Sequence, residues 1–138
     1  MSFTAIGDGL AVRLRTIRGL RVFALKDLPD SVNQFPAALV LPGETPYVTT
    51  LNSTDCDYNF RVILLFAKAD TPSAISKMLD YMAVSGDKSV VAAIHGDKTL
   101  DGSADTCKVS RNLGVGGTTW GGYVYLSSEW LVQIWAGE

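Results

Sequence analysis

The chain has few of the residues that carry most enzymatic and metal chemistry. Among its 138 residues it has one histidine, His95, and two cysteines, Cys56 and Cys107, which lie far apart in the sequence. A Ser-His-Asp or Cys-His arrangement would therefore depend on His95 alone, and a zinc site needs three or four ligands at short spacing. We expect His95 to cap the end of a short helix. We expect no enzymatic activity, no metal and no cofactor.

Long apolar runs and a strong excess of either charge are also missing. No segment approaches the roughly 20 apolar residues of a membrane span, and residues 1–14 do not resemble a signal peptide. The formal net charge of -2 argues against a general nucleic-acid binder. We therefore expect no membrane association, synthesis in the cytoplasm, and reduced thiols.

Two loops superficially resemble ligand-binding motifs. Residues 114–117 (Gly-Val-Gly-Gly) lead into a predicted strand and have no following lysine, unlike a phosphate loop. Asp97, Asp101 and Asp105 have roughly calcium-loop spacing, but the glycine is misplaced and no closing glutamate follows. We interpret the first as a hairpin turn and the second as a polar turn.

The composition, 47% hydrophobic and 19% charged, fits a single domain over residues 1–138 with its own core. Its charges are unevenly spread, because the first 26 residues contain one acid, Asp8, against five basic residues: Arg13, Arg15, Arg18, Arg21 and Lys26. A basic end and an acidic remainder suit head-to-tail contacts between copies, and equally a solvated surface.

Apolar periodicity predicts three helices. In the first, Phe3, Ile6, Leu10, Leu14 and Ile17 form one stripe, and Gly19 ends the helix. The second begins at Thr71-Pro72, ends at Gly86 and has the stripe Ile75, Met78, Leu79 and Met82. The third covers residues 89–94 and ends at Gly96.

Alternation predicts strands over residues 21–25, 37–41, 57–68, 106–113 and 122–135. In residues 57–68 the second face also becomes apolar from Ile63 onward, so another layer or another subunit must cover it. Residues 114–122 form a glycine-rich turn, and residues 44–55 form an extended arm or a long loop. This order of elements predicts an α+β fold, with a mainly antiparallel sheet, an N-terminal helix and two further helices packed on it, and a long C-terminal β-hairpin.

The C-terminal half resembles a known pattern. Residues 89–94 (Ser-Val-Val-Ala-Ala-Ile) lead through residues 97–102 (Asp-Lys-Thr-Leu-Asp-Gly) to Cys107-Lys-Val109. Tyrosines and an acid follow in residues 121–125 and 129–134. This run resembles siphophage tail terminators of the lambda type and the related tail-completion neck proteins. The resemblance covers residues 89–135 in sequence and nearly the whole chain in order of elements. Residues 44–55 depart from it.

The resemblance implies a structural protein of the virion, in the tail or neck, assembled in the host cytoplasm. It would form a hexameric ring that caps the tail tube, ends its polymerisation and provides the head–tail joining surface. Its partners would be further copies of itself, the tail tube protein and the head–tail connector, and DNA would pass through the lumen without specific binding.

The basic N-terminal segment and the two longest segments that the core does not need are our candidates for contact with partners. The residues predicted for these interfaces are Arg13, Arg15, Arg18, Glu44, Tyr47, Thr49, Asp55, Val115 and Trp120. Three alternatives stay open: another neck protein of similar fold, a non-viral module that binds a small ligand or peptide with residues 44–55 at its lip, and a hydrolase that uses His95.

Overall fold

The computed structural model describes residues 3–30, 32–43, 58–68 and 72–135. Its centre is a five-stranded sheet in the order β1-β2-β3-β5-β4, antiparallel except for the pair β1 and β2. The strands are β1 (Arg21–Phe23), β2 (Ala37–Pro42), β3 (Tyr58–Lys68), β4 (Thr106–Trp120) and β5 (Tyr123–Trp135). The predicted α+β class and the long C-terminal hairpin are confirmed.

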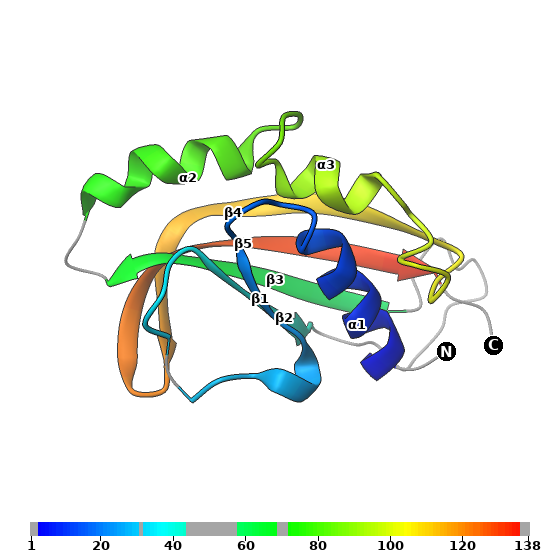
Figure 1. The fold of residues 1–138 in the computed structure, drawn as a ribbon, viewed down its shortest axis with the longest axis horizontal. Helices are drawn as coiled ribbons and strands as arrows, with labels where there is room; N and C mark the ends of the chain where they lie inside the picture. Colours follow the sequence, from blue (N-terminus) through cyan, green and yellow to red (C-terminus); the bar gives the residue numbers. More distant parts are fainter. Residues whose placement is uncertain (1–2, 31, 44–57, 69–71, 136–138) are drawn as a thin grey trace.

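Within the described ranges, three α-helices pack on this sheet: α1 (Phe3–Leu14), α2 (Ile75–Met82) and α3 (Val90–His95). Figure 1 shows α2 and α3 in a row along the sheet. Short 3-10 turns lie at Leu25–Asp27 and Pro72–Ala74. The hydroxyl of Ser89 caps α3 by accepting the N–H of Ala92 at 3.1 Å, a common helix start. None of the helices in the described ranges is long and apolar enough to cross a bilayer.

The main core lies between the helices and the sheet. The α1 side chains Ile6, Leu10 and Leu14 are fully buried, as predicted. They belong to one cluster with the helix-facing residues of β3 and β5, which include Phe60 and Trp130. Burying each such side chain stabilises the fold by about 1.5–3 kcal/mol. The helix ends at Leu14, earlier than predicted, although Ile17 stays buried in the turns that follow.

The opposite face of β3 is covered by this chain itself. Ile63 and Leu65 are 3% and 0% exposed, and they pack in a second cluster with Val32 and Tyr125. Val32 belongs to the connection between β1 and β2, and Tyr125 belongs to the hairpin, so no second subunit is required here. The Tyr125 hydroxyl also lies 3.3 Å from the backbone of Val32 and fixes this cover in place. Ala67 lies in the main cluster, because a β-bulge before it shifts the register.

The predicted stripe of α2 is wrong for two of its four residues. Ile75 and Leu79 are 37% and 58% exposed, whereas Met78 and Tyr81 face the core. The Tyr81 ring packs edge-to-face on Phe66 of β3 at 5.2 Å. Burial of the larger aromatic side chain therefore determines how the helix is rotated.

The predicted glycine-rich turn over residues 114–122 is also wrong. β4 continues to Trp120, and the turn consists of Gly121 and Gly122, whose φ angles are 60° and 85°. Positive φ at both central residues is the requirement of a type I′ hairpin turn. β4 accommodates its extra residues at two register irregularities, between Val109 and Arg111 and between Asn112 and Val115. The hairpin is thereby longer than predicted and bends away from α2 (Figure 1).

Candidate interaction surfaces

Arg13, a predicted interface residue, is used within the subunit. Its Nε donates a hydrogen bond to the carbonyl oxygen of Ala93 at 3.0 Å, near the end of α3. Its guanidinium also lies against Gly96, where a Cβ would collide with it. Arg13 therefore joins α1 to the carbonyl end of α3, where a positive charge is favourable.

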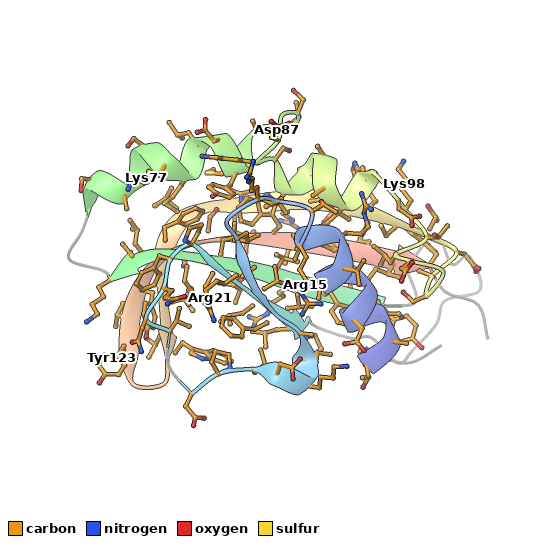
Figure 2. The ribbon with its side chains drawn as sticks, in the orientation of Figure 1. Arg15, Arg21, Lys77, Asp87, Lys98 and Tyr123 are labelled. Atoms are coloured by element: carbon orange, nitrogen blue, oxygen red, sulfur yellow. The ribbon has the colours of Figure 1, made fainter. Side chains whose placement is uncertain are left out.

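Arg15 and Arg18 are exposed in the connection after α1, and the described residues offer neither an ion-pair partner. Figure 2 labels Arg15 next to α1. Arg21, further along, donates to the side chain of Gln34. Of the three predicted arginines of α1 and its end, two are thus available to a partner.

The turn at residues 97–102, which carries the resemblance, is built by its own side chains. The Asp97 carboxylate accepts hydrogen bonds from the Thr99 hydroxyl, from the Thr99 N–H at 3.1 Å and from the Asp101 N–H at 3.3 Å. The Thr99 hydroxyl oxygen in turn accepts the N–H of Gly102 at 3.3 Å. These hydrogen bonds lower the pKa of Asp97, and the bond from the Thr99 hydroxyl has the largest effect. Within the described ranges, no three His, Cys, Asp or Glu side chains group as metal ligands.

Leu100 anchors this turn to α1. It adopts a left-handed backbone, with φ of 50°, and its side chain is fully buried. Its carbonyl oxygen and the Ser103 hydroxyl lie so close to Gly9 that a Cβ there would overlap both. The glycine that weakens the helix therefore allows close contact between α1 and the turn.

His95 acts as a hydrogen-bond acceptor at the sheet edge rather than as the predicted helix cap. Its Nε2 accepts the backbone N–H of Val109 in β4 at 3.0 Å, which places the proton of the neutral ring on Nδ1. Burial, followed by Lys98 and Lys108, lowers the pKa of His95. The nitrogen that a base would use is thus occupied within the fold.

Cys107 is a core residue. Its side chain is 2% exposed, and burial raises the pKa of the thiol to about 11. A thiol with that pKa remains protonated at neutral pH and is a poor nucleophile.

The hairpin carries exposed apolar side chains that sequence reasoning only partly found. Val115, which was predicted, is 42% exposed, and Leu113, Tyr123 and Val124 are exposed to 53%, 56% and 50%. Figure 2 shows Tyr123 projecting at the end of the hairpin. Trp120 is only half-buried, and its indole N–H donates to the carbonyl oxygen of Pro29 at 2.7 Å, so it also holds the hairpin against the connection between β1 and β2.

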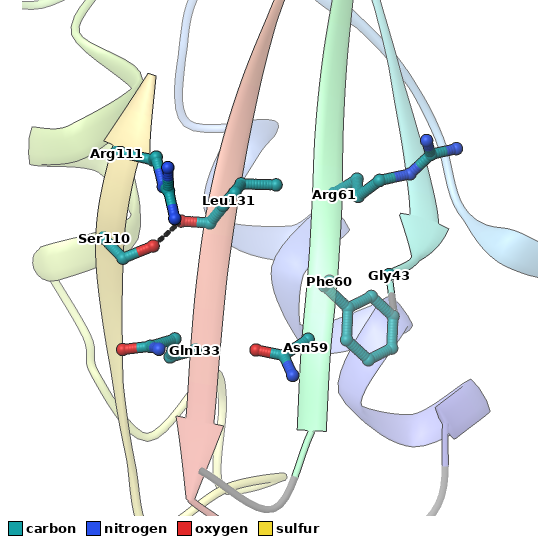
Figure 3. A pocket seen from close by; sticks show the side chains of 8 residues that line it. All are labelled: Gly43, Asn59, Phe60, Arg61, Ser110, Arg111, Leu131 and Gln133. Carbon is teal, nitrogen blue, oxygen red and sulfur yellow. Dashed lines mark hydrogen bonds between the residues drawn. The ribbon is translucent and has the colours of Figure 1, made fainter. Parts of the chain in front are cut away.

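A groove of about 520 Å³ crosses one end of the sheet, shown in Figure 3. Arg61 and Arg111 come from β3 and β4, on either side of β5, and Leu131 lies between them. The Arg61 guanidinium is 3.9 Å from Glu129, and its buried Nε has no hydrogen-bond partner in the described part of the chain. The remaining lining residues are Gly43, Asn59, Phe60, Ser110 and Gln133. This lining suits a polar or anionic group.

The predicted interface residues Glu44, Tyr47, Thr49 and Asp55, like Cys56, lie outside the described residues. No protein-family model matches the sequence, and no curated protein matches it significantly.

Proposed function

We propose that this chain is a structural protein of a phage tail, a tail terminator whose copies form a ring on the end of the tail tube. The observation that carries the proposal is the path of residues 89–135. A short capped helix leads through the Asp97–Thr99 turn into a long antiparallel hairpin, in the order that the tail-terminator pattern implies.

Exposed side chains support an assembly role. Arg15 and Arg18 present positive charge after α1, and the hairpin presents Leu113 and Val124 to solvent. A ring requires one face of a subunit to meet a different face of the next, and surfaces of unlike chemistry suit such a contact. The second face of β3 adds nothing to this argument, because the subunit covers it.

In this role the ring ends tube polymerisation and offers the joining surface for the filled head. Its partners are further copies of the chain, six in a ring, together with the tail tube protein and the head–tail connector. DNA passes through the lumen without base-specific contacts, which fits a chain with a net charge of only -2.

Electron microscopy of the purified protein tests the ring directly. We expect closed rings with a central hole, and replacing Arg15 and Arg18 together by glutamate should abolish them or alter their stability while the fold stays intact. A protein that remains monomeric at all accessible concentrations, both alone and in the presence of tail tubes, contradicts the proposal.

The groove favours a second candidate function, a module that binds a small polar or anionic ligand. Its lining includes two arginines, and the buried Arg61 Nε has no hydrogen-bond partner among the described residues. Binding at this groove should be lost in Arg61→Met and Arg111→Met variants. A monomer that binds such a ligand, and forms no rings, would favour this function over the first.

A further inference from the structure

The outer half of β4, residues 115–120, is an open sheet edge. β4 is the last strand of the sheet and pairs only with β5 among the described strands. From Val115 to Trp120 this pairing continues without a shift in register. The other side of such a strand presents unpaired backbone N–H and C=O groups, which form a template for a further strand.

The inner half of the same strand is protected in several ways. The N–H of Val109 is taken by His95, and Lys108 and Arg111 place charges beside the edge. At the second irregularity the Asn112 side chain accepts the N–H of Gly114 at 2.7 Å. Bulges, charges and capping side chains are the usual devices that stop edge strands from pairing. These protective features are confined to the inner half of β4.

The outer half has none of these devices. No charged residue occurs between Arg111 and Glu129. Gly116 lies in a regular strand, and a Cβ there would meet no atom of the described chain within 4 Å. Glycine weakens a strand interior and often marks a bulge, a tight bend or a site where another backbone approaches closely. Because the described residues place nothing against Gly116, the space beside it is open to a neighbouring molecule.

We propose that residues 115–120 pair antiparallel with the same residues of a second copy, across a two-fold axis. In such a contact residues near the axis meet their own counterparts and residues at one end of the segment meet the other end of the second copy, so a charged strand would bring like charges together and this uncharged one does not. Val115 and Thr119 lie on one face of the strand, and their β-branched side chains suit cross-strand contacts. This contact is separate from the ring contact proposed above.

A matched pair of substitutions on β4 tests the contact. Thr119→Lys places a charge inside the paired segment of each copy, opposite uncharged residues of the other, whereas Thr106→Lys makes the same change at an exposed position of the protected half. Analytical ultracentrifugation should give a wild-type mass that is an even multiple of the monomer. We expect Thr119→Lys to halve that mass and Thr106→Lys to leave it unchanged.

Hydrogen exchange of the wild-type protein gives a measurement that no variant can confound. Amides that point outward from residues 115–120 should become protected as protein concentration rises. An unchanged mass in a folded Thr119→Lys variant, or a wild-type protein whose outward amides exchange freely at every concentration, overturns the inference. If the wild-type protein forms rings and Thr119→Lys does not halve their mass, this contact is refuted and the ring proposal is unaffected. A dimer that Thr119→Lys dissociates, without rings, would support this contact and refute the ring.

Discussion

Replacing Gly9 by alanine tests the contact between α1 and the turn at residues 97–102. The new Cβ would overlap the backbone oxygen of Leu100 and the Ser103 hydroxyl. The Leu100 oxygen cannot move alone, because Leu100 is fully buried and its turn is held by the Asp97 hydrogen bonds. Either α1 or the whole turn must shift.

The magnitude follows from two opposing effects. Overpacking costs about 1–3 kcal/mol, and a backbone collision lies at the upper end of that range. Alanine recovers about 1 kcal/mol of helix propensity relative to glycine. We therefore expect Gly9→Ala to lower the free energy of unfolding by about 2 kcal/mol, which corresponds to a fall in Tm of roughly 8 °C for a domain of this size.

Gly7→Ala, on the same helix, is the matched control. Its Cβ would come closest to the Leu25 side chain, at 3.1 and 3.3 Å, which can move aside, and would make an ordinary contact with the Phe60 ring at 3.5 Å. The same gain in helix propensity should leave this variant within about 1 kcal/mol of the wild type. Urea denaturation of both variants measures the difference. A Gly9→Ala protein as stable as Gly7→Ala would refute the proposed packing of α1 on the turn.

Three further predictions concern the residues with definite structural roles. The lowered pKa of His95 means that the folded protein binds the proton more weakly than the unfolded chain does, so the free energy of unfolding should be full above about pH 6.5 and fall below it. Urea midpoints measured across this pH range should show the fall, and His95→Gln should lose part of it. An equal decrease in both proteins would count against the role of His95. Arg13→Ala should cost about 1 kcal/mol more than Arg15→Ala, since only Arg13 donates to a carbonyl of another helix, and equal unfolding midpoints would contradict this. Cys107, with a pKa of about 11, should not react with iodoacetamide at pH 8 in the native protein but should react in urea. Peptide mass spectrometry measures the labelling, and labelling of Cys107 in the native state would contradict its burial.

Long and regular apolar patterns predicted the fold well. Most of the predicted stripe of the first helix and most of the helix-facing residues of β3 and β5 are buried as expected, whereas Phe3 and Tyr58 are half-buried. A long, unbroken apolar period allows only one face of an element to point to the core. In α2 two overlapping sets of apolar residues could face the core. Tyr81 and Met78 prevail over Ile75 and Leu79 because Phe66, on a separate strand, receives the tyrosine ring. A local pattern contains no information about that partner.

The surfaces were harder to predict for the same reason. Arg13 and Ala93 are 80 positions apart, and their hydrogen bond removes one predicted contact residue from the surface. The glycines of residues 114–117 are compatible with either a turn or a strand. The side chain of Asn112 and the two irregularities of β4 decide in favour of the strand. Exposed Tyr123 and Val124 follow from the longer hairpin, and sequence reasoning missed them.

The length of tail tubes assembled without this protein tests the central claim most directly. Tube protein polymerising in a lysate that lacks the chain should form tubes longer than normal, and adding the purified chain should restore a uniform length. Tails of normal length that fail to join heads would contradict the terminator role and indicate another neck protein of similar fold.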